Sequence, residues 1–133
     1  MRIINIINNG NTKNLICEDG TIIQADLILV GIGIKPNINL ALQSGLTCNN
    51  GILVNEHCIT SDSNIFAIGD CSNHYNQILN QNIRLESVHN AVEQAKTVSK
   101  FITNKPEPYI QVPWFWTEQY NLKIQIAKLR REL

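Results

Sequence analysis

The sequence predicts an α/β fold, and three patterns lead to that prediction. Two continuous apolar runs, residues 26–31 and 65–68, are typical of strands that are buried on both faces of a sheet. A segment that begins near Glu86 repeats apolar residues at spacings of three and four, as an amphipathic helix does. Residues 3–23 alternate short apolar runs with tight-turn dipeptides, which indicates a small antiparallel meander.

The predicted meander comes first in the chain. Residues 3–7 and 13–18 are expected to be strands, and Asn9-Gly10 between them is a strong signal for a hairpin turn. Asp19-Gly20 predicts a second tight turn, after which residues 21–23 start a third strand.

Two glycines follow the first buried run. Gly31 and Gly33 let the backbone turn sharply and approach another group closely. Pro36 stands where a GxGxxG fingerprint needs its third glycine, so we do not expect a phosphate-binding loop here.

The rest of the chain alternates helices with strands. Asn37 or Asn39 is expected to cap a short helix over residues 39–44, which Gly45 ends. Ser87 is expected to be the N-cap of the long helix. The other expected elements are a strand at 52–54, a turn at 49–51, the buried strand at 65–68, a loop over 72–84, a linker at 105–108 and a one-faced strand at 122–126.

Composition and charge exclude several classes of protein. A length of 133 residues fits one domain or parts of several, and 44% hydrophobic with 17% charged residues indicates a folded chain. The formal net charge is zero, which argues against a general nucleic-acid or membrane-surface binder. The chain has no run of about 18 apolar residues and no signal-peptide pattern, so we expect no transmembrane helix and a cytoplasmic location.

Neither the cysteines nor the histidines form a recognisable site. The cysteines form no CxxC pair and have no accompanying histidine pair at zinc spacing, so reduced thiols packed as small apolar groups are expected, and neither zinc nor disulfides. The histidines have no nucleophile partner that a sequence can show, so surface or structural roles are expected. These residues are Cys17, Cys48, Cys58, Cys71, His57, His74 and His89.

The second buried run ends in Gly69-Asp70. It would bring one carboxylate to the carboxyl edge of a sheet, where open α/β sheets bind ligands. A ligand hydroxyl would satisfy a buried Asp70 carboxylate, and the alternative is an ordinary strand followed by an Asp turn. The helix that begins near residues 86–88 offers unpaired N–H groups, so the two features together suit a ligand with hydroxyl and carbonyl groups.

Two tryptophans stand two residues apart in a Trp-Phe-Trp block. Trp114 and Trp116 would share one face of an extended segment. They could stack on a flat ring or close a pocket, and the alternative is a hydrophobic plug between two domains. Both interpretations remain open at this point.

In chain order these segments resemble a known superfamily. Residues 26–37 and 60–71 resemble the FAD-dependent pyridine nucleotide–disulfide oxidoreductases. Residues 84–95 and 113–120 are similar to the ferredoxin reductases within that superfamily, and the Trp-Phe-Trp block is the most specific part. The resemblance extends to about residue 127.

The resemblance implies a partial fold. It is that of the FAD/NAD(P)-binding, glutathione-reductase-like three-layer proteins, with the start of an α+β C-terminal interface domain. Residues 1–35 would end the NAD-binding domain, 36–108 would form the C-terminal part of the FAD-binding domain, and 109–133 would start the C-terminal domain. Such enzymes have two GxGxxG folds and this chain has neither, so the chain alone is expected to be incomplete. Residues 128–133 also depart from the family pattern.

The resemblance also implies a function. The expected activity is that of a ferredoxin–NAD(P) reductase, which passes electrons from NAD(P)H through FAD to a [2Fe–2S] ferredoxin. That ferredoxin would serve a cytochrome P450 or a ring-hydroxylating oxygenase, and a separate chain with the missing N-terminal domains is a further possible partner. The alternative is a non-catalytic interaction module or a decayed gene product without FAD. A third interpretation, an NADH oxidase or nitrite reductase subunit, is disfavoured by Trp114 and Trp116.

The resemblance assigns roles to individual residues. Asp70 would bind the ribityl–phosphate region of FAD, the Val88 backbone N–H would meet the flavin pyrimidine edge, and Trp116 would lie near the isoalloxazine. A helix N-terminus there would stabilise negative charge on the reduced flavin. No catalytic residue and no metal ligand is expected. The remaining expected cofactor-binding residues are Gly69, Glu86, Ser87, Gly31 and Gly33.

Overall fold

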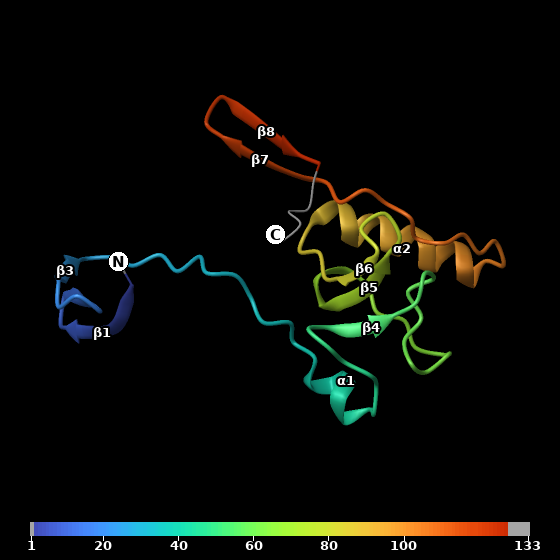
Figure 1. Cartoon of the computed structure of the whole chain (residues 1–133), viewed down its shortest axis with the longest axis horizontal. Coiled ribbons are helices and arrows are strands. Elements are labelled where there is room, and N and C mark those ends of the chain that lie inside the picture. The colour runs from blue at the N-terminus through green and yellow to red at the C-terminus, as the bar shows by residue number, and fades with distance from the viewer. Residues whose placement is uncertain (1, 128–133) are drawn as a thin grey trace. The chain divides into compact units, whose positions relative to one another are not determined.

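The computed structural model describes residues 2–127 and divides into two compact units. The first is Met1–Ile34 and the second is Lys35–Leu133 (Figure 1). The division falls next to the boundary that was expected at residue 35, while the assignment of the two parts to NAD-binding and FAD-binding domains stays a prediction.

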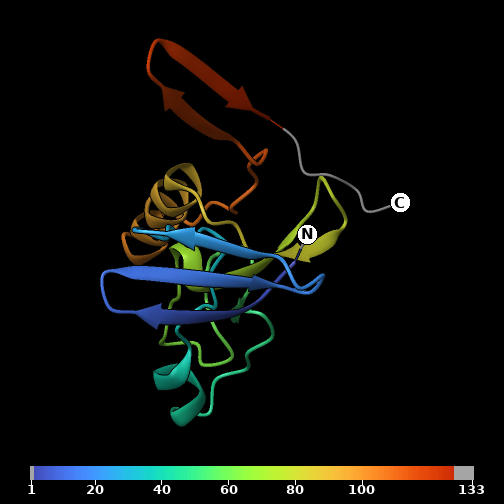
Figure 2. The same cartoon turned by 90° about the vertical axis from the view of Figure 1, so that its left-hand side faces the viewer.

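The first unit is the predicted meander. Strands β1 (Ile3–Asn9), β2 (Thr12–Cys17) and β3 (Ile22–Ala25) pair antiparallel in the order β1-β2-β3 (Figure 2). Gly10 and Gly20 lie in the two turns with φ of 74° and 84°, in the left-handed region that glycine adopts without strain. The meander and both turn predictions are therefore confirmed.

The predicted buried strand at residues 26–31 is wrong. This segment has irregular backbone, and the side chain of Leu29 is 94% exposed. An apolar run becomes a buried strand only where neighbouring strands bind its backbone and other elements cover its faces. In the described part of the first unit, no strand pairs with residues 26–31 and no element covers them. Gly31 and Gly33 lie in the same irregular segment, and Gly33 has a φ of 87°.

The second unit has a small mixed sheet. Strand β4 (Ile52–Val54) pairs parallel with β5 (Ser72–Asn76), and β5 pairs antiparallel with β6 (Gln81–Ile83). The strand predicted at 52–54 is confirmed, but the loop predicted over 72–84 is wrong because it contains the β5–β6 hairpin. The polar sequence of β5 hides its strand character, since the side chains that it buries form hydrogen bonds rather than apolar contacts.

The second predicted buried strand, residues 65–68, is also wrong. Phe66 forms one isolated bridge with Ile59, and the segment then enters a single 3-10 turn, η1 (Gly69–Cys71). Strand β5 follows this turn directly. Asp70 therefore lies in a turn that leads into a strand, rather than at the end of a strand, and its side chain is exposed rather than buried.

The short helix α1 (Asn39–Gln43) forms within the predicted range. Its N-cap is Ile38, so the prediction that Asn37 or Asn39 caps it is wrong. Gly45 follows the helix with a φ of 73°, as its predicted role at the C-terminal end requires.

The long helix α2 (Val88–Ile102) begins as predicted. The hydroxyl oxygen of Ser87 accepts a hydrogen bond from the backbone N–H of Asn90 at 3.1 Å, which confirms Ser87 as the N-cap. The side chains that α2 buries are polar and are Asn90, Gln94 and Thr97. Its apolar residues Val88 and Val92 are exposed instead. In this structure α2 therefore packs through its polar stripe.

A buried hydrogen-bond network explains that packing. The amide oxygen Oε1 of Gln94 accepts from the backbone N–H of Gly69 at 2.7 Å. The Ser72 hydroxyl lies 2.9 Å from this same oxygen and 2.9 Å from the Gly69 carbonyl, and its single proton serves one of them at a time. Gln94 is fully buried. Its amide thus joins α2 to the η1 turn and to the start of β5. Helix α2 and strand β5 lie beside one another in Figure 1.

Asn90 extends the network by one helical turn. Its amide group donates to the Leu85 carbonyl at 3.2 Å, and its amide oxygen accepts from the Tyr109 hydroxyl at 2.9 Å. The Tyr109 backbone N–H donates to the Glu56 carbonyl at 2.7 Å. The network therefore also fixes the segment that follows α2, where the linker at 105–108 was expected.

His74 lies against this network and has a structural role. It is 2% exposed, its ring packs edge-to-face on Tyr109 with centroids 4.9 Å apart, and its Nδ1 is 3.4 Å from the Gln94 amide nitrogen. Because Gln94 turns its oxygen to Gly69, the amide nitrogen donates and Nδ1 accepts. Burial lowers the pKa of His74 to about 4. Its Nε2 has no hydrogen-bond partner among residues 2–127.

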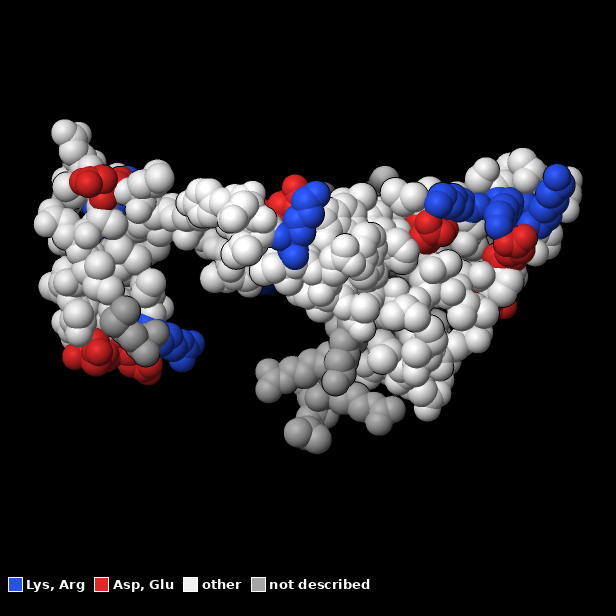
Figure 3. Space-filling model, turned by 90° about the horizontal axis from the view of Figure 1, so that it is seen from above, with Lys and Arg blue, Asp and Glu red and all other residues white. Residues whose placement is uncertain are grey.

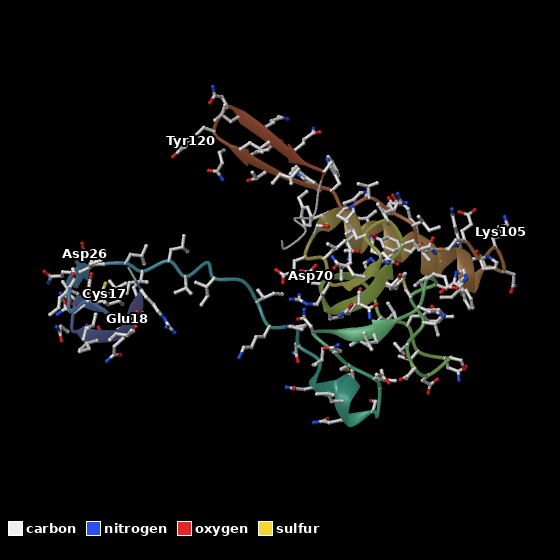
Figure 4. The ribbon with its side chains drawn as sticks, viewed as in Figure 1. Cys17, Glu18, Asp26, Asp70, Lys105 and Tyr120 are labelled. Atoms are coloured by element: carbon white, nitrogen blue, oxygen red, sulfur yellow. The ribbon has the colours of Figure 1, made fainter. Side chains whose placement is uncertain are left out.

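A hairpin of β7 (Phe115–Gln119) and β8 (Leu122–Ile126) follows, and it confirms the strand predicted at 122–126. Exposed Tyr120 lies at its tip with a φ of 54° (Figure 4). The predicted departure from the family pattern, residues 128–133, lies outside the described residues.

Charged residues of both signs lie next to one another on the face in Figure 3. Lys96 pairs with Glu93 at 2.6 Å on α2, and Lys100 pairs with Glu107. Between residues 2 and 127 no helix has the length and apolarity that a membrane crossing requires.

Gln94→Leu should destabilise the second unit by about 2–4 kcal/mol, because the N–H of Gly69 loses its buried acceptor while the volume is conserved. Urea unfolding followed by circular dichroism measures this change. The matched control is Gln43→Leu on the exposed surface of α1, for which we expect a change within about 0.5 kcal/mol. Equal effects of the two substitutions would contradict the importance of the network.

The second unit should lose stability as the pH falls from about 6.5 to about 4. The folded pKa of His74 is below its unfolded value of 6.5, so the unfolded state binds the proton first, and about 3 kcal/mol is lost across that window. Urea unfolding at about pH 7 and about pH 4.5 measures the loss. His74→Phe should remove most of this pH dependence, and an unchanged slope in that variant would show that other groups cause it.

Candidate functional site

The η1 turn holds Asp70 next to helix α2. Gly69 has a φ of 74°, which favours glycine, and its N–H is fixed by Gln94 of α2. A side chain at Gly69 would approach Ala91 of α2 to 3.6 Å, an ordinary contact, so the backbone angle rather than space requires glycine there. Asp70 follows and is exposed, and Figure 4 labels its position. Of the two interpretations of Asp70, the turn describes its backbone, and the ligand role stays a prediction.

Arg84 connects the Asp70 turn to the segment before α2. Its Nη1 donates to the Asp70 carbonyl oxygen at 3.0 Å and lies 2.8 Å from Oε1 of Glu86. Its Nε donates to the side-chain oxygen of Asn50 at 3.4 Å. The Arg84 side chain is 8% exposed, so this charge is largely removed from water.

Gly51 allows a neighbouring loop to pass close to this arginine. Its φ is 126°, and a Cβ atom would lie 2.8 Å from the Cys71 carbonyl oxygen and 3.0 Å from Cδ of Arg84. Only glycine meets both conditions without a shift of the backbone. The turn predicted at Asn49-Asn50-Gly51 thus also forms one wall around Arg84.

A cavity of about 280 Å³ opens at the start of α2. Ser87 caps the Asn90 N–H, and the N–H groups of Val88 and His89 have no acceptor among the described residues, as is usual for a first helical turn. The partial positive charge of a helix N-terminus therefore faces this region. The lining residues are Glu86, Ser87, Val88, Phe115 and Trp116.

The two tryptophans stack on one another beside the cavity. Their ring centroids are 4.9 Å apart with planes inclined by 29°, and His89 packs edge-to-face on Trp114 at 5.6 Å. Trp116 is 44% exposed and lines the cavity, so one indole remains available to a flat ring. The ring-stacking and plug interpretations both stay predictions.

Most of the expected site residues lie in the second unit. The second unit contains Gly69, Asp70, Glu86, Ser87, Val88 and Trp116, arranged around the η1 turn and the start of α2. Gly31 and Gly33 belong to the first unit, and their role in cofactor binding stays a prediction.

Sequence reasoning missed Arg84, Gln94 and Phe115. Arg84 is the one Lys or Arg between Lys35 and Lys96, and it stands two residues before Glu86. This spacing could have indicated an ion pair between the two residues. Asn90, Gln94 and Thr97 recur at helical spacing, and this polar stripe could have indicated the buried face of α2 and with it Gln94. Phe115 had no signal of its own, because its neighbouring tryptophans dominate that segment.

The site combines N–H donors, an exposed carboxylate and a flat aromatic surface. These groups suit a planar ring with a carbonyl edge that continues into a hydroxylated chain. In the described part of the chain, no group of three His, Cys, Asp or Glu residues could hold a metal ion.

Comparison with known proteins agrees with this geometry. The family model described as pyridine nucleotide-disulphide oxidoreductase matches residues 2–95. The chain is 43% identical over 115 residues to the putidaredoxin reductase of Pseudomonas putida, and 45% identical over 121 residues to the rhodocoxin reductase of Rhodococcus erythropolis. These matches cover 86% and 91% of this chain.

A solved structure has the same fold over nearly the whole chain. The ferredoxin reductase for the CYP199A2 system from Rhodopseudomonas palustris is similar with a TM-score of 0.89 and 37% identity, over 96% of this chain and 32% of that protein. The chain spans 27% and 28% of the length of the putidaredoxin and rhodocoxin reductases. By the match to more than half of its residues, the chain belongs to the pyridine nucleotide-disulphide oxidoreductase family.

Proposed function

We propose that this chain contributes the second half of a flavin site to a ferredoxin–NAD(P) reductase. The observation that carries the proposal is the cavity where the N-terminus of α2 meets Trp116. The names of the relatives, putidaredoxin reductase and rhodocoxin reductase, support the same activity. Because the chain spans about a quarter of those proteins, the remainder of the site would come from segments outside this sequence.

The residues around the cavity fit the ring of FAD. Trp116 offers a flat apolar surface, and the unpaired N–H groups of Val88 and His89 suit the carbonyl oxygens along one edge of the isoalloxazine. A cavity of about 280 Å³ is close to the lower end of the range for ring-sized ligands. When bound, FAD would take a hydride from NAD(P)H and pass electrons singly to a [2Fe–2S] ferredoxin.

Within this site the chain would bind and orient the cofactor. The α2 N-terminus would stabilise negative charge at the ring edge. Asp70, exposed at the η1 turn, would accept hydrogen bonds from ribityl hydroxyls, and Gly69 would give the backbone its sharp turn. Ser87 would keep the helix start in place through its bond to Asn90.

The proposal extends to domains and partners. Residues 1–35 would end an NAD-binding domain, 36–108 would complete an FAD-binding domain, and 109–133 would start an interface domain. The ferredoxin partner would serve a P450 or a ring-hydroxylating oxygenase, as the name of the CYP199A2-system reductase suggests for that relative. The cytoplasm is the proposed location, since its reducing conditions suit four cysteines that are free thiols.

The test restores the missing part of the site. We would co-express the chain with the N-terminal, glycine-rich dinucleotide-binding part of putidaredoxin reductase and measure the flavin absorbance of the purified complex. The expected complex is yellow with about one FAD per chain, and the chain alone is colourless. Asp70→Ala should weaken FAD binding about tenfold or more, which corresponds to roughly 1.4 kcal/mol.

The matched control is Asp26→Ala, which removes an exposed carboxylate of the first unit and should leave flavin content unchanged. A colourless complex with the original chain would favour the non-catalytic alternative. A yellow complex that Asp70→Ala does not affect would keep the flavin site but remove Asp70 from it.

A further inference from the structure

We propose that Arg84 is a positioning residue of this site: it holds the Asp70 turn against the start of α2 and neutralises Glu86 at the cavity. This inference rests on the proposed flavin site and assigns a role to a residue that the flavin argument above does not use. It predicts that both the geometry and the charge of the cavity depend on one guanidinium group.

One nitrogen atom of Arg84 makes both of the decisive contacts. Nη1 has two N–H groups, and it lies 3.0 Å from the Asp70 carbonyl oxygen and 2.8 Å from Oε1 of Glu86. Asp70 precedes β5 and Glu86 precedes α2, so the two contacts form a second link between the η1 turn and α2, besides the bond between Gly69 and Gln94. The Asp70 backbone and the Glu86 carboxylate therefore meet at a single nitrogen atom of the guanidinium group.

The surroundings of Arg84 prevent it from leaving this position. The Nε atom is tied to Asn50, and the aliphatic part of the side chain passes the backbone of Gly51, where even a Cβ atom would come within 3.0 Å of Cδ. With 8% of the Arg84 side chain exposed, the guanidinium has little contact with water. We call the contacts of Arg84 with Asn50, Asp70 and Glu86 the Arg84 clamp, and we infer that it is present before any flavin binds.

Arg84 also decides the charge of the cavity. Glu86 lines the cavity, and without Arg84 its carboxylate would be an unpaired negative charge next to the α2 N-terminus. An unpaired carboxylate would oppose negative charge at the ring edge, and the ion pair cancels that effect. The helix N-terminus then remains the main electrostatic influence on a bound ring.

Lysine should not replace Arg84. A guanidinium offers several N–H groups in a fixed planar fork, whereas an ammonium is a compact charge on a flexible stem. Arg84→Lys would keep the charge that faces Glu86 but would not hold Asn50, Asp70 and Glu86 together. The two roles, position and charge, can therefore be separated by substitution.

The clamp is tested in the chain without flavin. Hydrogen–deuterium exchange is compared for Arg84→Lys, Arg84→Met and the control Arg2→Met, which removes an exposed arginine of the first unit. We expect exchange over residues 69–71 and 86–89 to rise about tenfold in both Arg84 variants and to stay unchanged in the control. If Arg84→Met fails to fold, the exchange measured in Arg84→Lys decides the test. Unchanged exchange over residues 69–71 and 86–89 in Arg84→Lys overturns the positioning role of Arg84.

The charge role is tested in the FAD-loaded complex by the midpoint potential of the flavin. Arg84→Met should lower the potential, because it leaves the Glu86 carboxylate unpaired, and Arg84→Met with Glu86→Gln should restore it. A purely structural role would not be corrected by the second substitution. An unchanged potential in Arg84→Met, or no restoration, overturns the charge role.

The two tests separate failure of this inference from failure of the proposed function. A complex of the original chain that takes up no FAD overturns the proposed function and, with it, the charge role of Arg84. The exchange rates still decide the clamp, since they are measured without flavin.

Discussion

The hydrogen bond from the Gly69 N–H to the buried amide oxygen of Gln94 is the contact on which the candidate site depends. It fixes a left-handed glycine against the middle of α2, and the hydroxyl of Ser72 lies against the same oxygen. Because the bond is fully buried, its loss would leave a donor without water or protein as a partner. This contact holds the η1 turn against the middle of α2, and Arg84 links the same turn to the segment before the helix.

This constraint explains why α2 packs with its polar side inward. Asn90 and Gln94 satisfy the backbone of the η1 turn and of Leu85, so the buried face of the helix is selected by hydrogen bonds. Val88 and Val92 are left exposed, as are Leu27 and Leu29 of the first unit. In a protein of this family that is several times longer, such apolar positions would be covered by the remaining segments, which agrees with the share of the relatives that this chain spans.

Local signals predicted a large part of the fold. The meander, the Ser87 cap and the strand at 122–126 depend on turn dipeptides, a capping side chain and alternation, all of which act over a few residues. The apolar runs at 26–31 and 65–68 were wrong because a buried strand depends on distant partners. Asp70 was first singled out by its place after an apolar run, and the family resemblance added its role and that of Val88. The contacts of Arg84 join segments that are distant in the sequence.

We propose that the first N–H groups of α2 meet the ring of a flavin. The most direct measurement uses the ¹⁵N-labelled chain in a complex with an unlabelled dinucleotide-binding part and FAD, and follows amide NMR shifts when the flavin is chemically reduced. We expect the amide of Val88 to be among those that shift most, and the amide of Gly20 in the first unit to stay in place. A Val88 amide that does not move while the flavin is reduced would contradict it.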